Sequence, residues 1–374
     1  MAKRRKNGKS LSPRQWTFLA YIAGDNNLSD NGIEDIAEMT AVGTSTSSYA
    51  GVQIDTKGEH DGSVRYEISE PDVTGQAHRV VIERLPESDS GNPEILLNFL
   101  NWGLERYPAK NTITVVWNHG AGFRTVRRDI AFDDYGTSLD MNELKTAFTR
   151  AGLGTKNKVA ILGFDACLMN MLEIAHHLRN VAQYVVGSQE TEPGDGWPYD
   201  KVLKAMNRKP TPQAMAKAIV REYMRSYRVV GDSNITQSAI RTDRTEAAVL
   251  AWSRFGDALA ASLPRERSVI NLARTKVQSY EFPDYVDAIH FAKLIANGTT
   301  IPALRSRARA FAKAVARCIV ASDCEGGSVA NSNGVTIWYP PEKAQYLAFR
   351  GKYVAMDFYA VGPGWVKFLD AVFA

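Results

Sequence analysis

Short apolar segments that alternate with helical patterns are the feature of this sequence that most limits how it can fold. The segments 16–23 (WTFLAYIA), 111–117 (NTITVVW), 158–164 (KVAILGF) and 184–188 (YVVGS) read as buried strands. Helical patterns lie between them, as in 139–151, which stops at Gly152. Strands buried on both faces that alternate with helices are typical of a parallel sheet covered on both sides. We therefore predict an α/β fold with a mainly parallel β-sheet flanked by helices on both faces.

The pattern changes after residue 211. Largely helical segments follow at 212–227, 244–263, 284–297 and 302–321, and a late strand at 334–339 (GVTIWY) ends at two prolines. No clear linker separates two domains. We predict one elaborated α/β unit over residues 15–374, in which 15–210 form the core and 211–374 a helix-rich completion with a late strand.

The first fourteen residues differ from the rest in charge. Part of the formal net charge of +4 comes from five cations within the first ten residues, namely Lys3, Arg4, Arg5, Lys6 and Lys9. We expect residues 1–14 to form a disordered, solvated tail, although a basic tail can also touch nucleic acid or anionic lipid. No motif elsewhere supports nucleic-acid binding, and no apolar run approaches the roughly 18 to 20 residues of a membrane span. We therefore expect neither nucleic acid nor a membrane as a partner.

The cysteine content is relevant to the cellular compartment in which the protein is expected. Only Cys167, Cys318 and Cys324 occur, an odd number that implies no disulfide framework. The apolar stretch 16–23 is followed by no small-residue cleavage pattern of a secretory signal. A cytoplasmic location is the expectation that follows.

Two of the predicted core strands end in residues that can carry chemistry. One runs into Asn118, His119 and Gly120, and the other into Asp165, Ala166 and Cys167. Ligands of an open parallel sheet bind beyond the carboxyl ends of its strands. His119 and Cys167 are separated by about one strand–helix–strand unit, so adjacent parallel strands can bring them together as a base and a nucleophile.

The residue types fit nucleophilic catalysis by a thiol. A thiolate is favoured by a helix N-terminus and by imidazole, and we predict that a helix over 168–179 begins directly after Cys167. His119 can activate the thiol or protonate a departing amine. The backbone N–H groups of Gly120 and Cys167 can form an oxyanion hole, because a glycine lets a substrate carbonyl approach closely.

Asp165 lies two residues before Cys167, so both side chains point to the same face if the strand persists. A carboxylate at the base of a pocket would select Arg or Lys in a substrate. Each residue also has a plainer interpretation, since a cysteine is often a small buried hydrophobe and an aspartate often caps a helix. The coincidence of three such residues at matching strand ends favours the chemical interpretation.

Several motifs together resemble the clostripain family of cysteine peptidases, which are relatives of caspases, gingipains, legumain and separase. They are YIAGDNNL at 21–28, WNHG at 117–120, FDACLM at 164–169, GSQE at 187–190 and PGDGW at 193–197. The resemblance implies a caspase-like fold and an endopeptidase with His119 and Cys167 as a dyad, in which Asp165 shapes a pocket for a basic residue. It further implies a substrate-lining loop that includes Ser188, Gln189, Glu190 and Trp197, with Asp25 and Asn26 near the same edge. His290 stands where the family tends to carry an acidic residue.

The same resemblance raises two further expectations. Family members are often matured by cleavage after the catalytic histidine, where Arg124, Arg127 and Arg128 are candidates for self-cleavage; a solvated basic loop explains these residues equally well. Some members depend on calcium, and Asp129, Asp133 and Asp134 offer the oxygen ligands that this ion prefers. Chance clustering on the surface also explains the three aspartates, so we expect that no cofactor is required, with calcium as the alternative.

The sequence thus predicts a cysteine endopeptidase that hydrolyses peptide bonds after Arg or Lys through a thioester acyl-enzyme. Its partners would be protein or peptide substrates with a basic residue before the cut bond. The competing hypothesis is a caspase-like regulatory or scaffold protein whose protease activity is suppressed or gated by a protein partner.

Overall fold

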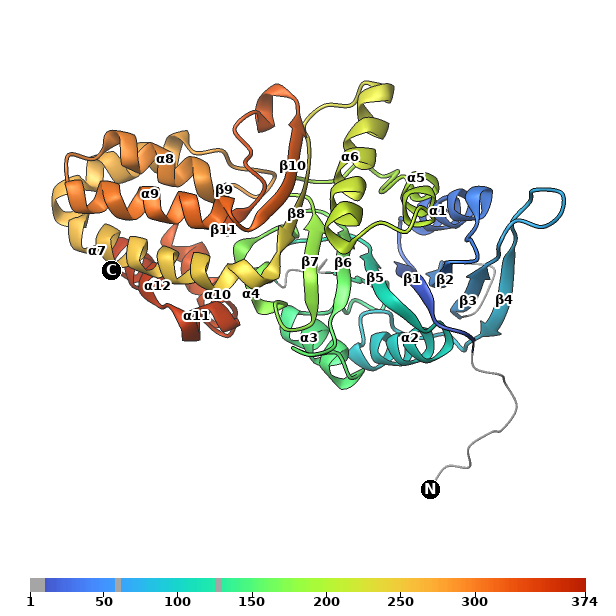
Figure 1. The fold of residues 1–374 in the computed structure, drawn as a ribbon. Helices are drawn as coiled ribbons and strands as arrows, with labels where there is room; N and C mark the ends of the chain where they lie inside the picture. The colour runs from blue at the N-terminus through green and yellow to red at the C-terminus, as the bar shows by residue number, and fades with distance from the viewer. Residues whose placement is uncertain (1–10, 58–61, 125–129) are drawn as a thin grey trace.

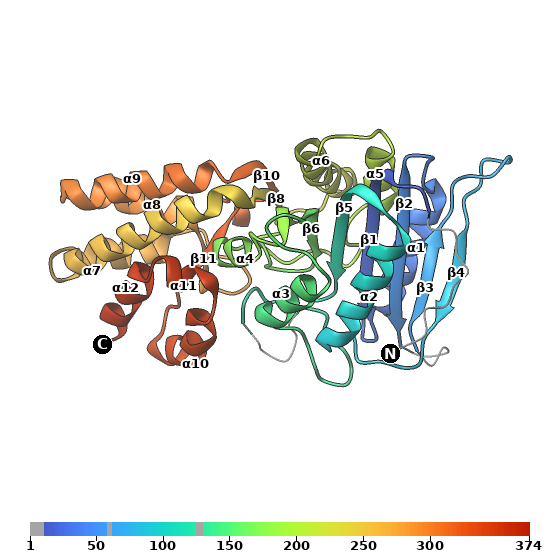
Figure 2. The same ribbon diagram turned by 60° about the horizontal axis from the view of Figure 1, so that its bottom comes forward.

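The computed structural model describes residues 11–57, 62–124 and 130–374, and Figures 1 and 2 show its ribbon from two sides. The strands are β1 Arg14–Gly24, β2 Ser48–Thr56, β3 Val64–Ile68, β4 Arg79–Arg84, β5 Ala109–Trp117, β6 Val159–Asp165, β7 Ala182–Gly187, β8 Ile235–Arg241, β9 Tyr285–Asp287, β10 Ile319–Glu325 and β11 Thr336–Trp338. The helices are α1 Ser29–Val42, α2 Pro93–Arg106, α3 Met141–Arg150, α4 Leu172–His177, α5 Tyr199–Met206, α6 Pro212–Val230, α7 Thr245–Lys276, α8 Ala288–Gly298, α9 Pro302–Ala316, α10 Lys343–Val354, α11 Asp357–Val361 and α12 Gly364–Phe373.

A nine-stranded sheet in the order β10-β8-β7-β6-β5-β1-β2-β3-β4 forms the centre of the fold. The five strands from β7 to β2 pair with one another in parallel. The strands on either side of them pair antiparallel. The prediction of a mainly parallel α/β sheet is therefore confirmed, with antiparallel strands added at both edges.

Helices cover both faces of this sheet, as Figure 2 shows. The side chains of β1 alternate between the two sides: Phe18 and Ile22 pack with α1, α5 and α6, whereas Leu19 and Tyr21 pack with α2, α3 and α4. Because successive side chains of a strand point to opposite faces, a strand that is buried on both sides must be apolar throughout. This explains the unbroken apolar run at 16–23.

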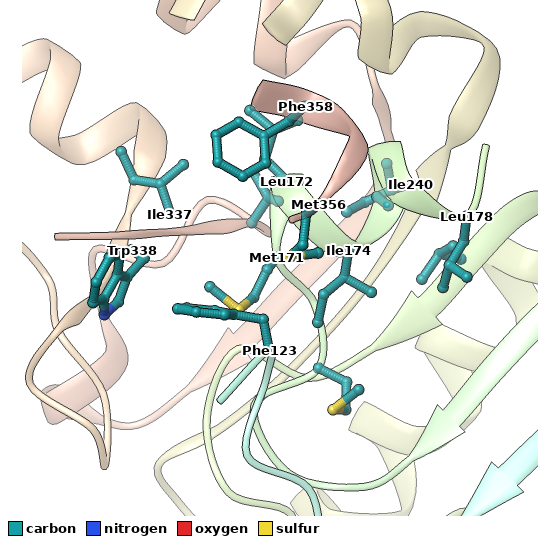
Figure 3. Packing of buried hydrophobic residues seen from close by; sticks show 14 of the residues in the cluster. Phe123, Met171, Leu172, Ile174, Leu178, Ile240, Ile337, Trp338, Met356 and Phe358 are labelled. Atoms are coloured by element: carbon teal, nitrogen blue, oxygen red, sulfur yellow. The ribbon is translucent and has the colours of Figure 1, made fainter. Parts of the chain in front are cut away.

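The C-terminal part extends the core on one side of the sheet. Helices α7, α8, α9 and α12 pack together, and the short strands β9 and β11 pair antiparallel. Figure 3 shows how this part joins the sheet: Phe123, from the loop after β5, lies among Met171 of the α4 region and Trp338 of β11. The rings of Phe123 and Trp338 are 5.2 Å apart between centroids. None of the helices in the described residues is long and apolar enough to cross a membrane.

Several predicted elements need correction. The helix expected at 168–179 begins only at Leu172, because Met171 pairs with Thr336 of β11 and Asn170 accepts a hydrogen bond from the Thr336 N–H at 3.1 Å. The segment 302–321 is helical only to Ala316, after which β10 joins the main sheet. In 284–297, three residues form β9 before the helix begins. Strands β3 and β4 match strand-like segments of the sequence at 64–69 and 79–85, whereas β2, β8 and β10 were not predicted.

A buried ion pair ties the loop after β5 to the C-terminal part. Arg124 Nη1 lies 3.0 Å from Asp284 Oδ2, and the two side chains are 8% and 0% exposed. The Trp338 Nε1–H also donates to Asp284 Oδ2 at 2.7 Å, and the guanidinium of Arg124 lies 4.0 Å from the ring centroid of Phe282. The two charges thus compensate each other in the interior of the protein.

Removal of one charge from this pair should destabilise the fold strongly. We expect Asp284→Ala to lower the free energy of unfolding by about 3–5 kcal/mol, because Arg124 would be left as an unpaired buried cation. Asp323→Ala is the matched control, since it breaks an exposed ion pair with Arg228 that is worth about 1 kcal/mol or less. Urea denaturation measures both, and equal losses would contradict the buried role of Asp284.

Candidate active site

The register of two neighbouring strands places the predicted residues side by side. Strands β5 and β6 pair in parallel with Trp117 opposite Asp165, the last residue of each strand. His119 and Cys167 each follow two residues later. The carboxyl ends of the two strands therefore deliver both side chains to the same edge of the sheet, as the sequence predicted.

A pocket of about 220 Å³ opens between these strand ends. Its lining comes from β5 and β6 and the loops after β1, β5, β6 and β7, namely Leu28, Trp117, Asn118, His119, Asp165, Ala166, Cys167, Glu192, Pro193, Gly194 and Gly196. The volume is below the roughly 300–1,000 Å³ of pockets for drug-sized ligands. The pocket therefore suits a single side chain.

The imidazole of His119 is oriented by an asparagine of the loop after β1. His119 Nε2 lies 2.9 Å from Asn27 Oδ1. Because an amide oxygen only accepts, Nε2 is the donor in this pair, and the basic lone pair of the neutral ring is on Nδ1. Asn118 holds the start of the loop, since its Nδ2 donates to Phe132 O at 2.9 Å and also to Ala23 O.

Cys167 is half-buried, and its sulfur is held by the loop after β7. The N–H of Glu192 donates to Cys167 Sγ at 3.2 Å. Burial, with further contributions from Asp165 and Glu190, raises the pKa of the Cys167 thiol. This direction favours the protonated form of the thiol in the empty pocket.

The expected activation of Cys167 by a helix N-terminus is wrong. Helix α4 starts at Leu172, and Leu168 has a left-handed backbone with φ 65°. A left-handed conformation costs a non-glycine residue about 1–2 kcal/mol. A hydrogen bond from the Leu168 N–H to Glu190 O, at 3.1 Å, helps to hold this sharp turn after the nucleophile.

Gly120 packs directly against the backbone of Cys167. A Cβ atom at this position would lie 2.2 Å from Cys167 O and 2.9 Å from Cys167 N. Only glycine fits at this distance, so the loop that carries His119 can approach the nucleophile closely. The two residues predicted to form an oxyanion hole are thus direct neighbours.

Asp165 is a buried carboxyl group at the floor of the pocket. It is 4% exposed, and its Oδ2 accepts hydrogen bonds from the Trp197 N–H at 3.0 Å and from the Tyr199 hydroxyl at 2.7 Å. Burial raises the pKa of Asp165. Gly196 lies close beneath it, since a Cβ there would approach Asp165 Oδ2 to 2.9 Å.

The other residues predicted to bind substrate lie outside this pocket. Ser188 and Gln189 are buried, and they bond to Thr236 Oγ1 at 2.7 Å and Asp287 Oδ2 at 3.1 Å, respectively. Glu190 accepts hydrogen bonds from the Thr191 and Glu281 N–H groups. Trp197 supports Asp165 through its backbone, while its ring packs against Gly163. Ser188, Gln189 and Trp197 support the loop from within the protein, whereas Glu190 is partly exposed.

The candidates for processing and for calcium are placed only in part. Arg124 is buried in its ion pair with Asp284, whereas Arg127, Arg128 and Asp129 lie outside the described residues. Asp133 accepts hydrogen bonds from the Ser90 and Tyr135 N–H groups, and Asp134 pairs with Lys57. Among the described residues, no group of three or more His, Cys, Asp or Glu side chains could hold a metal ion.

Sequence reasoning missed three residues of this site. Asn27 orients His119, Glu192 contacts both the thiol and Asp165, and Asp35 of α1 is a buried carboxyl whose pKa is raised by burial and by Asp165. Asp25 and Asn26 lie at the predicted edge of the sheet, but it is the next residue, Asn27, that contacts the imidazole of His119. His290, which departs from the expected family pattern, accepts a hydrogen bond from the Gln278 N–H at 2.9 Å.

Solved structures share this fold over nearly their whole length. A secreted C11 cysteine protease from Bacteroides thetaiotaomicron, in complex with an irreversible peptide inhibitor, is similar with a TM-score of 0.71 and 21% identity; the match covers 93% of this chain and 98% of that one. An inactive zymogen C11 protease from Parabacteroides distasonis matches with a TM-score of 0.73 and 18% identity, over 94% and 99% of the two chains.

Sequence comparison points to the same family. The chain is 32% identical to a clostripain from Hathewaya histolytica over an alignment of 131 residues, and the match covers 31% of this chain and 24% of that protein. The model of the clostripain family matches residues 20–371. Since this match covers nearly the whole sequence, the chain belongs to the clostripain family of cysteine peptidases.

Proposed function

We propose that this protein is a cysteine endopeptidase that cuts peptide bonds after Arg or Lys. The observation that carries the proposal is the pocket itself, which Cys167, His119 and Asp165 line together. A nucleophile, a base and a carboxyl group in one recess that holds a single side chain are the parts that this reaction needs.

The first half of the reaction forms a thioester. His119 Nδ1 takes the proton of Cys167 as the sulfur attacks the carbonyl carbon of the residue before the cut bond, called P1. The N–H groups of Gly120 and Cys167 stabilise the oxyanion that forms. The tetrahedral intermediate collapses when the C–N bond breaks, and the imidazolium of His119 gives its proton to the departing amine.

The second half regenerates the enzyme. Neutral His119 accepts a proton from a water molecule, whose oxygen attacks the thioester carbon. The C–S bond then breaks, the new carboxylic acid leaves, and the thiolate recovers a proton from His119. Asn27 keeps the imidazole in the tautomer that this exchange requires, since its oxygen accepts from Nε2 throughout.

The basic P1 residue follows from the charge of the pocket. Asp165 offers a carboxyl group at the floor, where the N–H of Trp197 and the hydroxyl of Tyr199 hold it in position. A guanidinium or ammonium group that reaches this floor forms a charge-assisted hydrogen bond in a site shielded from water. An acidic P1 side chain would meet like charge there.

Self-processing belongs to the same proposal. The chain is anchored before the segment 125–129 by Arg124, and after it by Ile130, which is buried and pairs with Leu139. Cleavage after Arg124 would require the buried ion pair with Asp284 to open. We therefore assign the cut to Arg127 or Arg128, where both anchored ends can stay in place.

The proposed steps route no bond through a metal ion, because the thiol and imidazole supply the nucleophile and the proton transfer. The expectation that no cofactor is required, with calcium as the alternative, stays a prediction. So does a regulatory protein partner, and a chain that bound such a partner without cutting any peptide would support the scaffold hypothesis instead.

A panel of fluorogenic peptides tests the proposal. Peptides that end in Arg or Lys should be hydrolysed, whereas those that end in Asp or Asn should not. Cys167→Ala and His119→Ala should each lower kcat/KM by roughly a thousandfold or more, as removal of a nucleophile or base does in other hydrolases. Hydrolysis after Asp, or full activity without Cys167, would show that the assignment is wrong.

Self-cleavage is tested on the intact chain. On prolonged incubation, the wild-type protein should yield two fragments whose new termini, read by mass spectrometry, lie after Arg127 or Arg128. Cys167→Ala should stay uncut, because it lacks the nucleophile. The double variant Arg127→Ala with Arg128→Ala should also stay uncut while it still hydrolyses small peptides added in excess. An uncut wild-type chain contradicts self-processing and leaves the peptidase proposal standing.

A further inference from the structure

Glu192 connects the nucleophile to the floor of the pocket. Its backbone N–H donates to Cys167 Sγ at 3.2 Å, and Glu192 is one of the residues that line the pocket. The carboxyl group lies within hydrogen-bonding range of the carboxyl group of Asp165. Two acidic groups therefore meet where the side chain of a substrate would end.

The carboxyl oxygens of Glu192 and Asp165 outnumber the hydrogen-bond donors around them. Glu192 Oε1 accepts from the Nε2–H of Gln237 on β8 at 3.2 Å, whereas the buried Oε2 has no donor among the described residues. Asp165 Oδ2 already accepts from Trp197 and Tyr199. Two carboxylates in contact cannot both stay ionised, because their charges repel and burial removes the water that would screen them. A proton between them gives each carboxyl group a partner.

The groups that face the pair from the surrounding elements do not relieve this charge. They are Asp35 of α1, Tyr199 of α5, Tyr223 and Tyr227 of α6, and the thiol of Cys167. Burial, followed by the charge of Asp165, raises the pKa of Glu192 well above its ordinary value. These groups are acidic or neutral, and the imidazole of His119 is the one basic side chain among the residues that line the pocket. A cationic ligand would therefore add the positive charge that the two carboxyl groups lack.

We propose that Glu192 is a second specificity-determining carboxyl of the pocket, which shares one proton with Asp165 when the pocket is empty and exchanges that proton for the cationic side chain of P1. The inference rests on the proposed function, since it concerns the residue at P1. On binding, the hydrogen bond between the two carboxyl groups breaks and its proton passes to solvent. Arginine or lysine then lies between two carboxylates.

This exchange makes the affinity for a basic ligand depend on pH. Below the pH at which the pair loses its proton, each binding event must expel that proton. Binding of a cation should then strengthen by up to about tenfold per pH unit as the pH rises, and level off once the pair is ionised. A neutral ligand of the same shape expels no proton, so its affinity should not change with the charge of the pair.

Calorimetry on the Cys167→Ala protein measures the proton directly. Nα-acetyl-arginine amide is titrated in buffers of different ionisation enthalpy, with the citrulline analogue as the neutral probe. We expect about one proton to be released per arginine bound, and none on binding of citrulline. Because the count is made on the native pair, it stands even where a substitution at Glu192 prevents folding.

Glu192→Gln then separates this role from a structural one. Glutamine can still accept from Gln237, and its amide can donate to Asp165, so the pocket keeps its shape with a fixed charge. Proton release should disappear, and kcat/KM for Arg peptides should fall about tenfold or more, as for loss of one charged partner. Citrulline peptides should change by no more than about twofold. The pH dependence of the Arg-to-citrulline ratio, which cancels the titration of the thiol, should become flat.

Glu34→Gln is the matched control. Glu34 is an exposed residue of α1 next to Asp35. Its replacement by glutamine therefore removes one negative charge near the site without changing the pocket. The Glu34→Gln protein should retain the proton release and the pH dependence.

No binding of the arginine amide, binding without proton release, or equal losses for arginine and citrulline peptides would each overturn the role of Glu192. Cleavage after Arg without proton release leaves the proposed function intact, whereas proton release without any cleavage refutes only the peptidase activity.

Discussion

The pairing of β5 with β6 is the constraint on which the rest of the site depends. Trp117 lies opposite Asp165, so two loops start at the same level of the sheet. A shift of one residue in this register would turn each side chain to the other face. Gly120 lets the two loops pack closely together, because its contact with the Cys167 backbone leaves no room for a Cβ atom. The relative position of His119 and Cys167 is thus set by the strand register and by the close contact between the two loops.

The chemistry of the pocket follows from how its carboxyl groups are buried. An ionised carboxylate costs several kcal/mol to bury unless charges or hydrogen bonds compensate it. Among the described residues, Asp165 accepts hydrogen bonds from Trp197 and Tyr199, and the carboxyl groups of Asp35 and Glu192 lie near it. The empty site is therefore short of positive charge. The proposed basic P1 side chain would supply this charge, so that its recognition would be electrostatic.

The fold and the central pair could be predicted because the signals are local. An apolar run such as 16–23 has to be buried on both faces, and strand ends then define where His119 and Cys167 lie. The strands β2, β8 and β10 escaped prediction because they are not uniformly apolar. In β2, for example, Gly51 is required where Trp102 and Tyr107 pack against it, and β10 is a half-exposed edge strand. The start of α4 depends on pairing with β11, more than 160 residues away, which no local pattern encodes. Asn27 and Glu192 lie in loops, where contacts are set by the tertiary fold.

The most direct test of the central claim is to trap the nucleophile with a peptide chloromethyl ketone that carries arginine at its reactive end, and to locate the adduct by mass spectrometry. The account predicts a single modification, on Cys167, which is lost in His119→Ala and is outcompeted by an arginine peptide. A reagent with aspartate in place of arginine should label far more slowly. Modification of Cys318 or Cys324 instead, or equal labelling by the arginine and aspartate reagents, would contradict the account.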